Sequence, residues 1–225
     1  MGGTLVHAEG IADPWRPAVL EAIERDFGKR WWAEALYDTD IRAARLKPHR
    51  QETNRWLGEW LAARGEFLTS DEIERLRIDF ARPLPHSFSL TPGAAEAMRW
   101  CKARDLAVAV VTNTISRGDD EVRRDFARFD LSDAVDHVIT SYSTGWEKPH
   151  AAIFERALSC ASVAAAETCM VGDELELDVI GAQRLGMRAV WKRPAAQSRD
   201  IPTSADATIA SLLELPGVLE AWLAR

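Results

Sequence analysis

Two short segments place polar side chains directly after apolar stretches, where they could contact an anionic ligand. In the segment 110–113, two valines precede Thr112 and Asn113, and a hydroxyl at the tip of a strand can donate a hydrogen bond to an anionic oxygen. In the segment 145–150, Lys148 precedes a proline at the expected start of a helix. Its ammonium group could neutralise a phosphate or a carboxylate. Taken singly, both patterns are also typical of ordinary strand ends and surface lysines.

A third segment is rich in acids. Residues 171–178 contain Asp173, Glu174, Glu176 and Asp178 directly after an apolar run. Mg²⁺ binds in proteins through one or two carboxylates together with water and substrate phosphate, so this segment could bind such an ion. The acids could instead only stabilise the N-terminus of the following helix. The glycine before Asp173 and the apolar run before that glycine favour the metal site.

Strand and helix patterns alternate from about residue 90 onward, and these elements must position the three segments. After a helix that ends near Trp100, the expected strands cover 107–113, 135–140, 168–173 and 187–191, and the helices between them cover 120–129, 151–160 and 179–185. Strands that alternate with helices indicate a parallel sheet with right-handed crossovers. Ligands bind such sheets beyond the carboxyl ends of the strands, which is where Thr112 and Asp173 are expected.

Residues 14–82 show only helical periodicity and predict a separate helical unit. Proline in the first turn predicts a helix entry near residue 16, and Thr69 followed by Glu72 resembles a capping box. Five of the nine tryptophans lie in this stretch, namely Trp15, Trp31, Trp32, Trp56 and Trp60. We expect them to form the core of a small helical bundle, although one or two could instead face a substrate cavity.

The composition limits the partners and the location. The 225 residues are 47% hydrophobic and carry a net charge of −7, which is typical of a globular protein and disfavours nucleic acid and anionic membranes as partners. Three cysteines without metal-ligand spacing favour a reducing compartment. No signal peptide or membrane-length apolar run is visible, so the expected location is the cytoplasm. The oligomeric state stays open.

In this order, the three segments resemble the haloacid dehalogenase superfamily. Thr112 matches the family's motif II, Lys148 matches motif III, and Asp173 and Asp178 match the GDxxxxD form of motif IV. The resemblance covers nearly the whole chain, and the combination is more specific than any of its parts. It implies a Rossmann-like α/β core formed by residues 1–13 and 83–225, with an inserted α-helical cap of the C1 type formed by residues 14–82.

The resemblance also implies a reaction and a set of roles. In the family an aspartate attacks phosphorus and forms an aspartyl-phosphate, with Mg²⁺ between the acids and the phosphate. Thr112 and Asn113 would contact the phosphoryl oxygens, and Lys148 would neutralise the nucleophile and the phosphate. Asp173 would bind Mg²⁺, and Asp178 would support either the ligand shell or Lys148. The implied substrate is a small phosphorylated metabolite.

The start of the chain departs from the family's motif I, which reads DxDGT after an apolar strand. Aligning Gly3-Thr4 with the GT places Gly2 at the second aspartate and the nucleophile one residue before Met1. A gap at the centre of the sheet would bury unpaired backbone groups, at about 1–3 kcal/mol each. We therefore expect the protein to begin upstream, with a strand that ends in an aspartate. The backbone carbonyl of Gly2 could still bind the metal.

Gly2 also lacks the carboxyl group that acts as general acid and base in the family, a contribution of roughly 10²–10⁴-fold. Three interpretations therefore stay open. The first is a Mg²⁺-dependent hydrolase of the phosphatase type. The second is a catalytically inactive binding or regulatory protein, and the third is a dehalogenase-type hydrolase that works without metal. The retained Thr112, Lys148, Asp173 and Asp178 favour the first.

Overall fold

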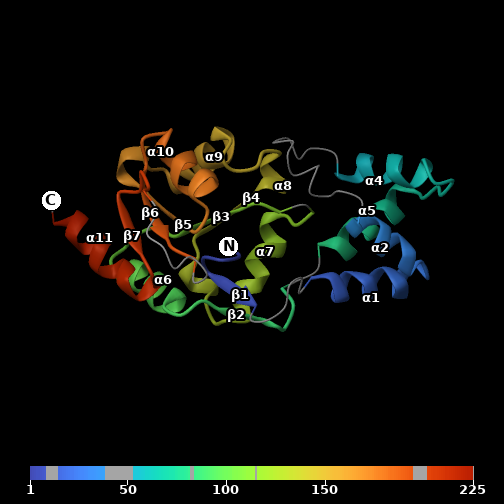
Figure 1. Cartoon of the computed structure of the whole chain (residues 1–225), viewed down its shortest axis with the longest axis horizontal. Helices are drawn as coiled ribbons and strands as arrows, with labels where there is room; N and C mark the ends of the chain where they lie inside the picture. Colours follow the sequence, from blue (N-terminus) through green and yellow to red (C-terminus); the bar gives the residue numbers. More distant parts are fainter. Residues whose placement is uncertain (9–14, 39–52, 82–83, 115, 195–201, 225) are drawn as a thin grey trace.

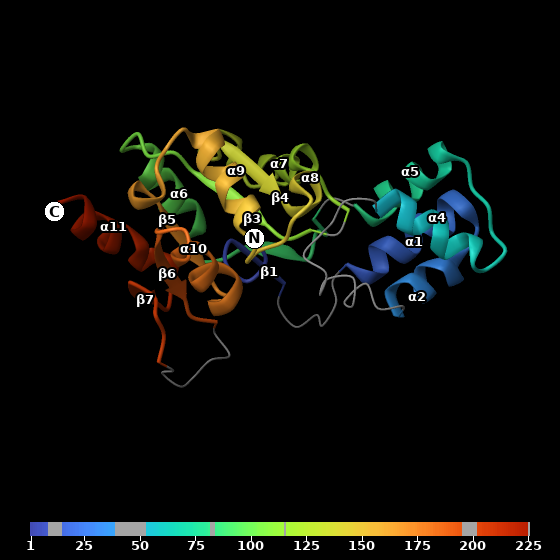
Figure 2. The same cartoon turned by 90° about the horizontal axis from the view of Figure 1, so that it is seen from above.

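The computed structural model describes residues 1–8, 15–38, 53–81, 84–114, 116–194 and 202–224, and these form two parts. A bundle of helices lies at one end of the long axis in Figures 1 and 2, and an α/β part with all the described strands makes up the rest. The predicted domain boundaries, at residues 13–14 and 82–83, lie outside the described residues. The division itself therefore stays a prediction.

Within the described residues, the bundle contains the helices α1 (Arg16–Phe27), α2 (Arg30–Asp38), α4 (Thr53–Ala62) and α5 (Ser70–Phe80). Their apolar faces enclose one core whose centre includes Ile23, Leu36, Leu61 and Leu76, all fully buried. The predicted capping box is confirmed. Thr69 accepts a hydrogen bond from the Glu72 backbone, and the Glu72 carboxylate accepts one from the Thr69 backbone at 2.8 Å.

The tryptophan prediction is confirmed for three of the five residues. Trp32 and Trp60 are buried in the helical core, and Trp56 packs against it. It is wrong for Trp31, which is 43% exposed because neighbouring residues of a helix point about 100° apart and Trp32 already faces the core. It is also wrong for Trp15, whose ring packs 5.4 Å from the ring of Phe88 in the α/β part.

The α/β part contains parallel strands, as predicted. Strand β3 (Ala109–Thr112) pairs with β4 (His137–Thr140), β5 (Cys169–Gly172) pairs with β6 (Arg188–Lys192), and β6 pairs with β7 (Ala207–Ile209). A separate antiparallel pair joins β1 (Val6–Ala8) to β2 (Phe88–Leu90). Together with the helical bundle, these strands confirm the predicted α/β, Rossmann-like fold.

Helices cover both faces of the parallel strands (Figure 1). The longer ones are α6 (Ala94–Lys102), α7 (Asp119–Ala127), α9 (Ala151–Ala161) and α11 (Leu215–Leu223), and the shorter ones are α8 (Ser141–Thr144) and α10 (Gly181–Gln183). Single 3-10 turns cover Ser132–Ala134, Ala165–Glu167 and Leu212–Glu214. The helix expected over 179–185 begins earlier, as a π-helical turn over Leu175–Ile180. None of the described helices has the length and apolarity that spanning a membrane requires.

The parallel strands form two half-sheets instead of one continuous sheet. Within the described residues, β3 is paired to β4 alone and β5 to β6 alone. A cavity of about 780 Å³ lies where the two half-sheets face each other, and residues 107–111 and 168–171 line it. The expectation of a strand covered on both faces at 107–113 is therefore wrong in part, because Ala107 and Ala109 border this cavity and are exposed.

Candidate functional site

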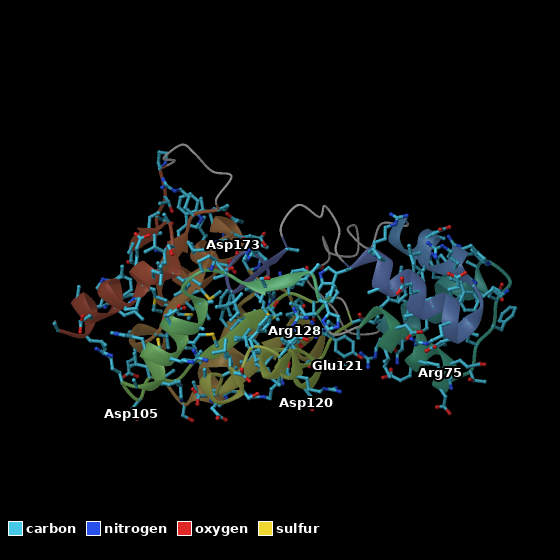
Figure 3. The ribbon with its side chains drawn as sticks, turned by 90° about the horizontal axis from the view of Figure 1, so that it is seen from below. Arg75, Asp105, Asp120, Glu121, Arg128 and Asp173 are labelled. Carbon is cyan, nitrogen blue, oxygen red and sulfur yellow. The ribbon has the colours of Figure 1, made fainter. Side chains whose placement is uncertain are left out.

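The predicted site residues lie at the carboxyl ends of the two half-sheets. Thr112 ends β3 and is buried, and Asn113 follows it. Gly172 ends β5, and Asp173 follows it. Figure 3 labels Asp173, which lies beside the N-terminal segment of the chain. The parallel strands thus place two of the three predicted motifs at one edge, which is where α/β sheets bind ligands.

Lys148 and Asp178 form a buried ion pair at this edge. The Lys148 Nζ atom lies 2.5 Å from Asp178 Oδ1, and both side chains are buried. The second carboxylate oxygen of Asp178 accepts a hydrogen bond from the Glu174 backbone at 3.1 Å. Because both oxygens of Asp178 already have partners, the structure places this residue on Lys148, which is one of the two roles expected for it.

Asn113 fixes the backbone of Lys148. Its Nδ2 atom donates to the Lys148 carbonyl at 3.2 Å, and its Oδ1 atom accepts from the Lys148 N–H at 2.8 Å. This two-bond contact joins the end of β3 to the segment before α9 and so determines where the lysine side chain starts. The predicted contact of Asn113 with phosphate stays a prediction. Its observed contacts are those of a residue that positions Lys148.

Asp173 is bound to the first residues of the chain. Thr4 Oγ1 donates to Asp173 Oδ1 at 2.5 Å, and the indole N–H of Trp191 donates to the Asp173 carbonyl at 3.0 Å. Lys192 is buried, and its Nζ atom donates to the Gly3 carbonyl at 2.7 Å. These contacts place the Gly2-Gly3-Thr4 segment between the ends of β5 and β6.

Gly3 meets two separate requirements for glycine. Its φ angle is +78°, in the left-handed region that side-chain-bearing residues rarely adopt. A Cβ atom built on it would also overlap the Asp173 carboxylate. The close approach of this backbone to Asp173 therefore depends on the absence of a side chain.

The amino group of Met1 is buried among the charged residues of the site. Burial, followed by the positive charge of Lys148, lowers its pKa to about 6. Glu174, at the mouth of the site, has a raised pKa because of desolvation and then because of the nearby carboxylates of Asp178 and Asp173. Three carboxylates thus share this edge, and their mutual repulsion favours a bound cation.

The side chains at this edge include the kinds of donor that Mg²⁺ binds. Within the described residues, no group of three or more His, Cys, Asp or Glu side chains is placed to enclose a metal ion. Mg²⁺ needs only one or two carboxylates and completes its shell with water and phosphate oxygens. Asp173 and Glu174 supply carboxylates here, and the Gly2 carbonyl is a third candidate ligand.

Two supporting residues, Trp191 and Lys192, were missed by the sequence analysis, and Thr4 was noted there only as part of the motif I match. All three contact either Asp173 or the Gly2-Gly3-Thr4 segment. The sequence offered one signal, since Lys192 directly follows an apolar strand and so had to lie at the same carboxyl edge. His150 caps the N-terminus of α9, because its Nδ1 atom accepts a hydrogen bond from the Ala152 N–H at 3.2 Å.

Comparison with known families identifies the chain. Residues 1–186 match the haloacid dehalogenase-like hydrolases. The chain belongs to this family. Its similarity to the family thus covers the helical bundle and the edge that carries Lys148, Asp173 and Asp178.

Several curated relatives of this haloacid dehalogenase-like chain are named as phosphatases. It is 37% identical to the ribulose-1,5-bisphosphate 5-phosphatase of Halopiger xanaduensis over 52% of this chain and 48% of that protein. It is 33% identical to the glyceraldehyde 3-phosphate phosphatase of Pyrococcus furiosus over 57% and 54%, respectively. The chain thus spans about half the length of these two relatives. It is 29% identical to the phosphoserine phosphatase of Thermus thermophilus over 88% of this chain and 82% of that protein.

Solved structures of the family resemble the chain over almost its full length. A haloacid dehalogenase-type phosphatase of Thermococcus onnurineus has a TM-score of 0.62 at 25% identity and covers 96% of this chain and 94% of its own. A 2-haloacid dehalogenase of Pseudomonas syringae has a TM-score of 0.66 at 25% identity, with the same coverage. The fold is therefore shared by relatives named for two different reactions.

Proposed function

We propose that this chain is a Mg²⁺-dependent, phosphatase-type hydrolase of a small phosphorylated metabolite. The observation that carries the proposal is the buried Lys148–Asp178 pair beside Asp173 at the carboxyl ends of the strands. A buried ammonium group next to a carboxylate-lined edge suits a ligand that carries phosphate together with a divalent cation. The phosphatase names of the relatives support the same reaction class.

Each predicted residue receives a role in this proposal. Thr112 donates its hydroxyl to a phosphoryl oxygen, and Lys148 neutralises the phosphate and the attacking carboxylate. Asp178 and Asn113 fix the direction of Lys148 through the contacts described above. Asp173, the Gly2 carbonyl and Glu174 would bind Mg²⁺, which supplies positive charge to the phosphate when bound. The metal role of Asp178 also stays part of this proposal, because carboxylate oxygens that accept one hydrogen bond each can still accept a further partner.

We infer that the nucleophile is a carboxylate on the residue bonded to the amino end of Met1. The Met1 nitrogen lies among Lys148, Asp173 and Asp178, so a residue joined to it would have its side chain at this edge. The attack would form a bond between a carboxylate oxygen and phosphorus and break the bond to the leaving oxygen, which water must protonate because Gly2 has no side chain. Water would then cleave the acyl-phosphate.

The remaining expectations follow from this function. We propose that residues 14–82 act as a cap, that substrate choice depends on side chains of that cap, and that the protein works in the cytoplasm. The expected partner is a small molecule, with neither nucleic acid nor membrane involved, in keeping with the net charge of −7.

The test is hydrolysis of an aryl phosphate by the 225-residue chain and by a chain extended at Met1 with an apolar segment ending in aspartate. We expect turnover only from the extended chain and only with Mg²⁺. Changing the added aspartate to asparagine should abolish turnover, and so should Lys148→Met. Lys102→Met is the matched control, because Lys102 pairs with Asp136 at 2.6 Å outside the site. Turnover that survives Lys148→Met would overturn the assigned role.

A second candidate is dehalogenase-type hydrolysis. It is favoured by the structural similarity to the 2-haloacid dehalogenase and by the missing acid at Gly2, since carbon–halogen substitution needs no proton for the leaving halide. The discriminating measurement is halide release from a 2-chloro acid in the presence of a chelator. Halide release without metal, combined with no aryl phosphate turnover, would make this candidate the better one. If an extended chain folds but catalyses neither reaction, the inactive binding protein remains.

A further inference from the structure

The end of β6 contacts the site through two neighbouring side chains. The register of the ladder pairs Trp191 with Gly172, so Lys192 lies level with Asp173 at the carboxyl edge. Successive side chains of a strand point to opposite faces. Trp191 is buried on one face and donates its indole N–H to the Asp173 carbonyl at 3.0 Å. Lys192 leaves the strand on the other face and donates to the Gly3 carbonyl at 2.7 Å.

The Lys192 ammonium group is buried with one neutral acceptor. Lys192 is 8% exposed, and among the residues that the structure describes its Nζ atom donates to the Gly3 carbonyl and pairs with no carboxylate. Desolvating an ammonium group is costly, and an ion pair is the usual compensation. Lys102 has such a partner in Asp136. The contact with Gly3 is therefore the feature that a role for Lys192 has to explain.

The Gly3 carbonyl belongs to the segment that directs the Asp173 carboxylate. The Gly3 N–H donates to the Val6 carbonyl at 2.9 Å, so this segment forms a closed turn. Thr4, the next residue, donates its hydroxyl to Asp173 Oδ1 at 2.5 Å. Lys192 thus binds the peptide group between Gly3 and Thr4, and Thr4 in turn sets the direction of the carboxylate.

The second carboxylate oxygen of Asp173 has no protein partner. Within the described residues Oδ1 accepts from Thr4, whereas Oδ2 accepts no hydrogen bond. Oδ2 lies against the Gly3 backbone, since a Cβ built on Gly3 would be 2.1 Å from it. The Gly2 carbonyl belongs to the preceding peptide group. A displacement of Gly3 would therefore move two of the proposed Mg²⁺ ligands relative to each other.

We propose that Lys192 is a positioning residue of the Mg²⁺ site, which binds the Gly3 carbonyl and so keeps the Gly2 carbonyl and the Asp173 carboxylate in place for one cation. The use of this contact for Mg²⁺ rests on the proposed function, whereas the contact itself does not. The charge of Lys192 acts in the opposite direction, because an ammonium group repels a nearby divalent cation. Positioning and charge therefore predict opposite changes in Mg²⁺ affinity when the ammonium group is removed.

The experiment compares the 225-residue chain with Lys192→Met, Lys192→Arg and Arg188→Met. Methionine keeps an apolar stem without the charge, and arginine keeps the charge and several N–H donors. Arg188 is the matched control, because it lies on the same face of β6 at the opposite end of the strand and is exposed. The measurements are Mg²⁺ affinity by isothermal titration calorimetry, hydrogen exchange of residues 1–8, and the melting temperature.

We expect Lys192→Met to weaken Mg²⁺ binding by roughly tenfold or more and to speed amide exchange in residues 1–8 by roughly the same factor. Lys192→Arg should restore most of both, and Arg188→Met should change neither. The melting temperature of Lys192→Met should fall little, because the variant removes a buried charge that has no carboxylate partner among the described residues. Unchanged or tighter Mg²⁺ binding by Lys192→Met would overturn the proposal. If that variant does not fold, Lys192→Gln takes its place.

A double-mutant cycle tests whether the effect passes through Thr4. Thr4→Val removes the hydroxyl that binds Asp173 Oδ1 and keeps the shape of the side chain. Because Lys192 and Thr4 act on the same carboxylate, the double variant should lose less Mg²⁺ affinity than the product of the two single losses. A loss equal to that product would mean that Lys192 acts independently of Thr4, which contradicts the proposal.

The readouts separate this inference from the proposed function. Faster exchange in Lys192→Met, without Mg²⁺ binding by any of the chains, would count against the proposed function and support the contact of Lys192 with the first residues. Unchanged exchange of residues 1–8 in Lys192→Met would overturn the inference whether or not the original chain binds Mg²⁺.

Discussion

At the residue scale, the Lys148–Asp178 ion pair should show the largest effect of a single substitution. Lys148→Met removes the atom 2.5 Å from Asp178 Oδ1, and a buried carboxylate left without its cation typically costs about 3–5 kcal/mol of the free energy of unfolding. Lys102→Met is the matched control, because Lys102 and Asp136 are 32% and 30% exposed, and we expect a loss below about 1 kcal/mol. Urea unfolding measures both, and equal losses would contradict the argument.

Gly3 offers a second test at this scale, because another glycine shares its backbone conformation. Gly3 and Gly65 have φ angles of +78° and +76°, but only a Cβ on Gly3 would meet Asp173, since nothing lies within 4 Å of one on Gly65. We expect Gly65→Ala to cost about 1 kcal/mol from backbone strain and Gly3→Ala to cost clearly more. Denaturant unfolding of both variants checks this, and similar costs would mean that the Asp173 carboxylate moves aside freely.

The Cys169 thiol should give a pH dependence of its own. Burial, followed by the charge of Asp206, raises its pKa to about 12, above the ordinary value of about 8.5. The folded protein thus keeps a proton that the unfolded chain releases, so stability is full below about pH 8.5 and falls as the pH rises from there towards 12. Comparing the unfolding free energy of Cys169→Ala with that of the original chain at pH 8 and pH 10 measures this loss, which the variant should lack.

At the element scale, the cap of α5 tests how much local sequence stabilises the helical bundle. Thr69→Ala removes the hydroxyl that accepts from the Glu72 backbone and should cost about 1 kcal/mol. Hydrogen bonds from the Thr69 backbone and hydroxyl lower the pKa of Glu72, so this stabilisation is present above the unfolded pKa and is lost as the pH falls through the folded one. Glu72→Gln should lose that pH dependence in thermal unfolding between pH 3 and pH 6. If Glu72→Gln keeps the pH dependence, Glu72 is excluded as the source of that dependence.

The elements that the sequence predicts well are those with apolar runs. Strands β3 to β6 lie in short segments rich in apolar residues, and their alternation with helices indicated the parallel order. Strands β1, β2 and β7 have three residues each, too few for any period to emerge. The π-helical turn at 175–180 was not predictable either, because its acids suit an ordinary helix start.

In the site, too, some residues could be predicted from the sequence, whereas their contacts could not. Asp173 could be selected from sequence because it directly follows an apolar strand, Asp178 because it belongs to the acid-rich segment after that strand, and Lys148 because it precedes a proline at an expected helix start. Their partners depend on how the strands are ordered in space. Thr4 lies 169 positions from Asp173 in the chain, and Lys192 lies 189 positions from Gly3. Likewise, the contact of Asn113 with the Lys148 backbone required the relative placement of β3 and α9.

At the scale of the whole molecule, α7 anchors the chain on both sides of the helical bundle. The guanidinium of Arg128 donates to the carbonyls of Leu84 and Pro85 at 2.7 and 2.9 Å, and the Leu84 N–H donates to Asp125 at 3.1 Å. Arg117, which pairs with Asp125 at 2.7 Å, lies 5.4 Å from the ring of Trp15. Figure 3 shows Arg128 and Glu121 on the side of the α/β part that faces the bundle. Residues in or next to α7 therefore contact the chain both before and after the helical bundle.

Arg77 of the bundle contacts this helix through Glu121, and this contact supports the last prediction. Arg77 is buried, donates to the Ser116 carbonyl, lies 3.3 Å from the Glu121 carboxylate and sits 5.0 Å from the ring of Tyr142. Arg77→Met removes these polar contacts while keeping most of the apolar stem, so the bundle should separate more easily from the α/β part without losing its own core.

Small-angle scattering and circular dichroism together test that separation. We expect Arg77→Met to increase the radius of gyration above that of the original chain, with unchanged helical content. Arg75→Met is the control, because Arg75 lies two residues away on the same helix but is exposed. In Figure 3 it points away from the α/β part. An equal radius in both variants would show that apolar packing alone fixes the two parts, whereas lost helicity in Arg77→Met would make Arg77 a stabilising residue of the bundle itself.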